Sequence, residues 1–240
     1  MQTPETIIFY TLCAGACIPL GGALASIEKI RPQWLEQEFR HAVIAFGGGV
    51  LIAAVALLLV PEGTRLVNHT GFNVLFLLSG GLCFFVVERA LGVRRRARPQ
   101  FTAMLLDFIP ESLALGSAFA AGSESAITLS VFIGLQNLPE GFNAFRELRS
   151  VPGTGAARII GSMVLLVPLG PLVAGAGILW FGDNPLLPGA IMLFASGGIL
   201  YLIFQDIAPQ SRMRRHWAPP LGAVLGFCVG LLGNSLVPCG

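Results

Sequence analysis

Two short stretches of this 240-residue chain place carboxylate and amide side chains at helical spacing beside a proline. Asp107 lies four positions before Glu111, and Gln136 lies four positions before Glu140. This spacing puts both side chains of each pair on one face of a helix, one turn apart. A proline directly before each glutamate removes a backbone N–H bond, bends the helix and frees a carbonyl oxygen. Two such helices would direct four oxygen-bearing side chains at one point, which indicates a cation site.

Both stretches lie inside long apolar runs, where a charged side chain at the bilayer centre costs about 2.5 to 3.5 kcal/mol. Asp107, Glu111 and Glu140 have no Lys or Arg within their own apolar runs. Three acids at one level repel one another, so either they are protonated or a cation holds them. A divalent ion would neutralise two of them, with Gln136 as a neutral oxygen donor and Asn137 as a further candidate ligand.

A single Pro-Glu pair is more often a simple helix end, and Pro61-Glu62 is interpreted in that way. Two copies at matched depth, each with a polar partner four residues earlier, favour the cation site instead.

The composition places these stretches in a membrane. Hydrophobic residues make up 54% of the chain and charged residues 12%, whereas a soluble domain carries about 25% charge. The chain is therefore predicted to be an all-α, polytopic membrane protein that forms one transmembrane domain over residues 1–240. Its surroundings are the lipid bilayer, and no nucleic-acid partner is expected. The five cysteines are interpreted as small apolar residues of helices.

Eight apolar runs are long enough to cross a bilayer, which needs about 20 residues. They cover residues 7–26, 41–60, 71–91, 101–121, 125–145, 157–181, 187–208 and 218–237.

Charge placement gives the orientation. Of the 15 basic residues, 14 follow the odd-numbered runs, and only Arg65 lies on the other side. The positive-inside rule then predicts an inner-membrane protein with both termini extracytoplasmic. On these bounds Glu111 and Gln136 lie near the midplane, and Asp107 and Glu140 each lie one turn nearer the cytoplasm.

Two segments of the sequence resemble each other, and this internal similarity is called the internal echo below. Gly48-Gly49 leads to Pro61-Glu62 in the second run, and Gly197-Gly198 leads to Pro209-Gln210 in the seventh, which points the opposite way. An inverted repeat of a transporter would look like this, although glycine pairs are common in membrane helices on packing grounds alone.

The two motifs resemble a known pair. Asp107-x-x-Pro-Glu111 and Gln136-Asn137-x-Pro-Glu140-Gly are similar to the tandem His-Asn-x-Pro-Glu-Gly motifs of the ZIP (ZRT/IRT-like) metal transporters. The chain is identified as a divergent, bacterial-type member that lacks the usual His ligands. The resemblance implies an inverted-repeat fold of eight spans and uptake of zinc, iron or manganese by alternating access in an elevator-like movement.

Carried over by position, the resemblance implies one metal site of Asp107, Glu111, Gln136 and Glu140, with Asn137 beside it. The family has a second metal site, whose ligands include an Asn on helix four and an acidic residue on helix six. In this sequence Phe108 and Val167 stand at those two positions. One metal rather than two is therefore expected, as cargo and not as a cofactor.

The seventh run ends in Gln205-Asp206-Ile-x-Pro, which resembles the family's Asp-Glu-Ile-x-Pro. Asp206, with Gln205, is expected near the cytoplasmic mouth, either in an exit or proton-relay role or as a helix-end carboxylate near Arg212. An all-oxygen site favours Mn²⁺, Fe²⁺ or Mg²⁺, whereas the family points to zinc or a broad range.

Two alternatives stay open at this point. A ZIP-like protein that lacks the histidines would move protons or a small solute, or would sense metal. An intramembrane aspartyl hydrolase would pair Asp107 with Asp206, but Gly-x-Gly-Asp, His-Glu-x-x-His and nucleophile-elbow motifs are all missing. The sequence thus predicts a carrier rather than an enzyme. Glycine-rich helix faces allow a homodimer without demanding one.

Overall fold

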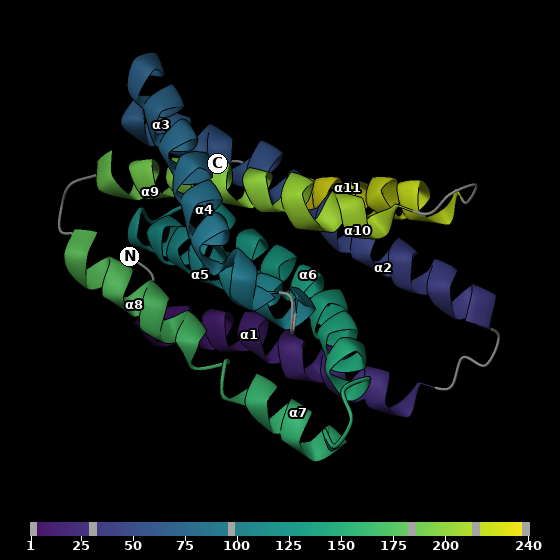
Figure 1. Ribbon diagram of the computed structural model, residues 1–240. Helices are drawn as coiled ribbons and strands as arrows, with labels where there is room; N and C mark the ends of the chain where they lie inside the picture. The colour runs from purple at the N-terminus through teal and green to yellow at the C-terminus, as the bar shows by residue number, and fades with distance from the viewer. Residues whose placement is uncertain (1–3, 29–32, 96–98, 182–185, 213–216, 237–240) are drawn as a thin grey trace.

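The computed structural model describes residues 4–28, 33–95, 99–181, 186–212 and 217–236, and every regular element in these ranges is a helix (Figure 1). The predicted all-α class is therefore confirmed. Two of the elements, η1 and η2, are π-helical and lie within longer helices. In chain order the elements are α1 Pro4–Ile27, α2 Gln33–Ala53, η1 Ala54–Leu59, α3 Val60–Val67, α4 Thr70–Arg95, α5 Pro99–Ala120, α6 Ser125–Arg149, α7 Ala156–Val164, α8 Leu169–Phe181, α9 Leu186–Leu202, η2 Ile203–Ile207, α10 Ala208–Ser211 and α11 Ala218–Leu236.

Six helical segments of the described ranges are long and apolar enough to cross a membrane. The other two predicted spans correspond to α5, whose described apolar part is Phe108–Ala120, and to α6, which carries Gln136 and Glu140. The chain is thus a membrane protein by the length and composition of its helices. The six segments are Glu5–Ile27, Glu38–Val67, Thr70–Ala90, Ala156–Ala176, Leu186–Ser211 and Ala218–Ser235.

The helices pack in two rows of four that meet at the centre. One row runs α11, α2, α6 and α1, and the other runs α4, α9, α5 and α8, each helix contacting the next. The rows contact each other where α5 packs on α6, where α3 packs on α9 and where α1 packs on α8, and Figure 1 shows α5 and α6 in the middle of the bundle. The helices that carry the predicted site therefore lie at a contact between the two rows.

Glycines of the internal echo lie at equivalent contacts in the two rows. A Cβ atom on Gly49 of α2 would overlap the backbone of Ala223 in α11. A Cβ atom on Gly197 of α9 would overlap the backbone of Leu77 in α4 in the same way. Only glycine permits such close approach of two helix backbones.

Both echo segments also widen into a π turn directly before their proline. The N–H of Val60 bonds to the carbonyl of Val55, and the N–H of Ala208 bonds to the carbonyl of Ile203. The residue donating this bond is in each case the one before the proline, Pro61 or Pro209. Because a proline ring clashes with the carbonyl four residues earlier, one extra residue in the turn relieves the clash.

Two boundaries differ from the sequence-based expectation. The predicted span 157–181 is two helices, α7 and α8, separated by a turn over residues 165–168 that ends at Pro168. Helix α2 begins at Gln33, so residues 33–40 belong to the same helix as the predicted run 41–60 and lengthen it at its N-terminal end. Helices α5 and α6 run through Pro110 and Pro139, as the predicted runs 101–121 and 125–145 do.

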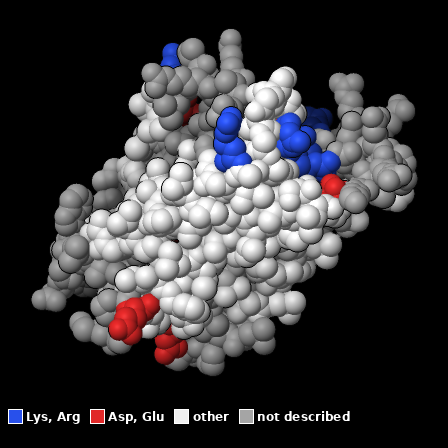
Figure 2. All heavy atoms as spheres, turned by 90° about the horizontal axis from the view of Figure 1, so that it is seen from below, with Lys and Arg blue, Asp and Glu red and all other residues white. Residues whose placement is uncertain are grey.

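Charged side chains are separated on the face shown in Figure 2. Lys and Arg gather along one edge, and the largest groups of Asp and Glu lie at the opposite edge. A broad uncharged band lies between them, as expected of a surface in contact with lipid acyl chains.

Candidate functional site

The second motif forms a hydrogen-bonded pair in the interior of the bundle. Gln136 is 0% exposed, and its Nε2 donates a hydrogen bond to Oε1 of Glu140 one turn later on α6. The predicted placement of these two side chains on one helix face is therefore confirmed. Within the described part of the chain, Oε1 of Gln136 and Oε2 of Glu140 are buried without a hydrogen-bond partner.

Asn137 serves a different contact. Its Nδ2 donates a hydrogen bond of 2.9 Å to the carbonyl oxygen of Ala14 on α1. Adjacent helix positions point about 100° apart, so Asn137 turns toward α1 while Gln136 turns toward Glu140. The side chain links the two helices, and its Oδ1 accepts no hydrogen bond from the residues described.

Glu140 also faces a small cavity between α2, α6 and the η2–α10 segment. The volume of this cavity is about 30 Å³, room for a single water molecule or ion. Its polar lining consists of Glu140, Asn143, Asp206 and Gln210. Asp206, which was expected at the cytoplasmic mouth, thus shares a cavity with a residue of the predicted metal site.

Asn143 was missed from the sequence, although a signal for it exists. Gln136, Glu140 and Asn143 stand at positions i, i+4 and i+7, which is one continuous face of α6. Asn143 lies just beyond the motif, which ends at Gly141.

Glu111 occupies a different environment. The side chain is 2% exposed and lines a separate cavity of about 10 Å³. The other lining residues are apolar: Val50, Leu51, Ala54, Leu59, Ala114, Leu129, Phe132, Ile133 and Ile199. The side chain of Asp107 lies outside the described residues. Of the four predicted ligands, the structure therefore joins Gln136 to Glu140 and places Glu111 in a cavity of its own.

Among the described side chains, no three His, Cys, Asp or Glu residues converge in a group that could hold a metal ion. The polar cavity contributes two carboxylates, and its remaining oxygen donors are amides. A cation there would depend on neutral oxygen ligands as much as on acids.

Gln205 turns away from the cavity that its neighbour Asp206 lines. Its Nε2 donates a hydrogen bond of 3.2 Å to Oε1 of Glu88 on α4, and the Tyr201 hydroxyl donates to Oε2 of the same carboxylate. These bonds connect α4 to α9 and η2. Gln205 is therefore placed as a helix contact, and Asp206 is the residue of the pair that faces the interior cavity.

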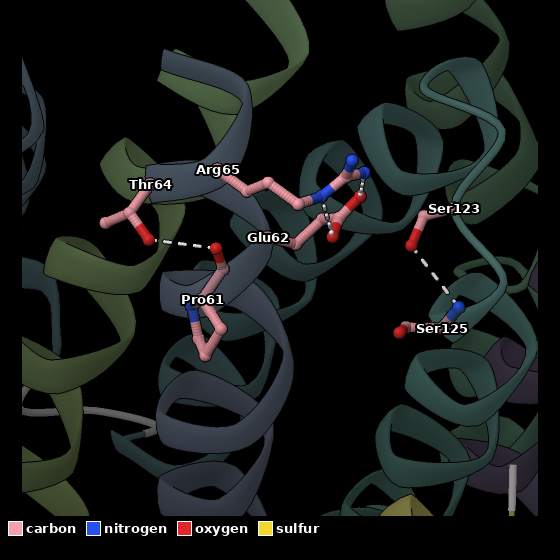
Figure 3. A network of polar contacts seen from close by, with 6 residues as sticks. All are labelled: Pro61, Glu62, Thr64, Arg65, Ser123 and Ser125. Carbon is pink, nitrogen blue, oxygen red and sulfur yellow. Dashed lines mark hydrogen bonds and ion pairs between the residues drawn. The ribbon is translucent and has the colours of Figure 1, made fainter. Parts of the chain in front are cut away.

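The Pro61-Glu62 pair differs from the two motifs, because its acid forms an ion pair within its own helix. Oε1 of Glu62 lies 2.6 Å from Nη2 of Arg65 one turn later, near the end of α3 (Figure 3). The hydroxyl of Thr64 bonds back to the carbonyl oxygen of Pro61 at 2.9 Å. Here the acid is neutralised by its own helix, in contrast to Glu140, which accepts a hydrogen bond from the neutral amide of Gln136.

Neither a family model nor a curated protein matches this sequence.

Proposed function

We propose that the protein transports divalent transition-metal cations, with zinc, iron or manganese as cargo. One observation carries the proposal: Glu140 and Gln136 each keep a buried oxygen atom without a donor in the described interior of a membrane helix bundle. A buried carboxylate needs a positive partner or a proton, because the bilayer interior supplies no water. A cation bound at this pair would supply the missing partner.

The helix arrangement supports alternating access. In a chain of eight spans, an inverted repeat would relate the first three spans to the last three. Under that relation the two rows contain equivalent spans in the same order. The shared glycine contacts and the shared π turns fit that relation. In transporters built this way, the ion site lies where the two repeats meet. We place the ion site at the Gln136–Glu140 pair of α6, with both chain termini on the extracytoplasmic side.

Each predicted ligand has a role in this proposal. Glu140 supplies negative charge, Gln136 a neutral oxygen and Asn137 the link to α1. Asp107 and Glu111 on α5 would complete the ligand set during transport. Asp206 would receive the ion on its way to the cytoplasm, since it shares a cavity with Glu140.

The test is metal uptake into proteoliposomes by Glu140→Gln. This change keeps the size of the side chain and removes its charge, so we expect uptake of Mn²⁺ and Zn²⁺ to fall at least tenfold. A loss of about 1.4 kcal/mol in binding free energy is sufficient for that effect.

The matched control is Glu124→Gln. Glu124 is exposed at the start of α6, so the change removes an equal charge from outside the bundle and should leave uptake unchanged. Full uptake by a folded Glu140→Gln variant would remove this residue from the transport mechanism.

The cavity of Glu111 favours a second candidate function, the movement of protons or a small solute. Apart from Glu111 itself, the described residues that line this cavity are apolar. Under this alternative, liposomes with a pH gradient would show proton flux that depends on Glu111 and is unaffected by added metal.

A further inference from the structure

The cavity between α2, α6 and η2 has a donor set that the sequence motifs did not contain. Its polar lining brings Glu140 and Asn143 of α6 together with Asp206 of η2 and Gln210 of α10. Asn143 and Gln210 belong to neither of the tandem motifs. The lining, as far as it is described, contains two carboxylates and no Lys, Arg or His.

The Asn143 side chain provides the observation that indicates a bound ligand. It is 1% exposed, and its Oδ1 has no hydrogen-bond partner within the described ranges. A buried acceptor left unsatisfied costs about 1 to 3 kcal/mol. The amide also lines the cavity, so an ion placed there would satisfy the oxygen.

Local backbone geometry presents Asp206 to the same cavity. Asp206 lies in the π turn Ile203–Ile207, which ends two residues before Pro209. π turns are rare and occur often at functional sites, because the extra residue redirects side chains. The equivalent π turn before Pro61 carries no acid, so the two halves of the echo differ here.

The chemistry of the donors restricts the ion. Two carboxylates and two amides offer oxygen atoms, and the one soft atom in the lining is the thioether sulfur of Met104, a weak ligand. Oxygen donors suit Mg²⁺ and Mn²⁺, whereas imidazole and thiolate ligands suit Zn²⁺. A volume of about 30 Å³ admits one ion with little accompanying water.

We propose that Asn143, with Glu140 and Asp206, forms an oxygen-donor cation position that shifts the metal preference toward Mn²⁺ and away from Zn²⁺, compared with a site that contains imidazole. The inference rests on the proposed function for its biological meaning, and it names the substrate class of the same site. Asn143 is its specificity-determining residue, because of the two amides in the lining it is the one whose oxygen is buried without a partner among the described residues.

The experiment is equilibrium binding of Mn²⁺ and of Zn²⁺ to the full chain in lipid nanodiscs. Asn143→Leu should weaken Mn²⁺ binding about tenfold. Asn143→His should raise the ratio of Zn²⁺ affinity to Mn²⁺ affinity about tenfold or more, because imidazole replaces the amide oxygen. Asn143→Asp keeps an oxygen donor and should retain Mn²⁺ binding. If Asn143→Leu fails to fold, loss of Mn²⁺ binding by a folded Asn143→Asp variant would overturn the inference.

The matched control is Thr128→Val. Thr128 is also on α6, is 4% exposed and has a buried hydroxyl without a partner among the described residues, but it lies outside the cavity lining. This variant should bind Mn²⁺ as the unaltered protein does. Equal loss in Thr128→Val and Asn143→Leu would overturn the inference, since the effect would then be one of packing.

Uptake measurements separate this inference from the proposed function. Uptake that depends on Glu140, combined with an unchanged metal preference in all three Asn143 variants, would overturn the Asn143 assignment and leave the transporter standing. Absence of uptake, combined with the expected binding shifts, would leave the site standing and overturn transport.

Discussion

At the scale of single residues, Asn137 shows that a buried amide in the motif stabilises the fold. Its hydrogen bond to the Ala14 carbonyl crosses from α6 to α1. In Asn137→Asp, a carboxylate oxygen faces that carbonyl and the N–H donor is lost, so we expect the free energy of unfolding to fall by about 1 to 3 kcal/mol. Urea titration in detergent micelles, followed by tryptophan fluorescence, would measure the change.

Ser235→Ala provides the comparison. The Ser235 hydroxyl donates only to the Leu231 carbonyl of its own helix, at 2.8 Å, and the side chain is exposed. Its loss should change the unfolding free energy by less than about 0.5 kcal/mol. Equal unfolding midpoints for the two variants would show that the Asn137 bond has no net effect on stability.

At the scale of the elements, close packing of α9 on α4 decides where glycine is required. In Gly197→Ala the added methyl group would overlap the Leu77 backbone, and we expect a loss of about 1 to 3 kcal/mol. In Gly161→Ala, on the exposed side of α7, nothing lies within 4 Å of the added atom. That variant should be stabilised by up to about 1 kcal/mol, since alanine favours helix. Thermal melting of both proteins, followed by size-exclusion chromatography, tests for the opposite signs.

At the scale of the whole molecule, the orientation in the membrane is open to direct measurement. The positive-inside rule places the turn before α4 outside and the turn after α6 inside. In a variant without native cysteines, Thr70→Cys should react with a membrane-impermeant maleimide on intact cells. Ser150→Cys should react only after the membrane is opened. Both residues are exposed in the structure; the reverse pattern of labelling would invert the proposed topology.

The all-helical class and the apolar helices were predictable because they depend on local properties. Apolar length, a basic cluster after each odd-numbered run and the i, i+4 spacing of Gln136 and Glu140 are all visible in the sequence. Each of them acts within one helix or at its end, so no knowledge of neighbouring helices was required. The π turns were not predicted, since a proline in a helix is equally compatible with a kink, a break or a wider turn.

The sequence by itself determined that this is an all-helical membrane protein with polar side chains along one face of an interior helix. Periodicity and hydropathy are sufficient for that conclusion. Only the tertiary structure decided which polar groups share a space: Glu140 with Asn143 and Asp206, and Glu111 apart from them. The physical reason is that glycine contacts and π turns set how helices distant in the chain approach and rotate, and no single-helix pattern encodes that relation.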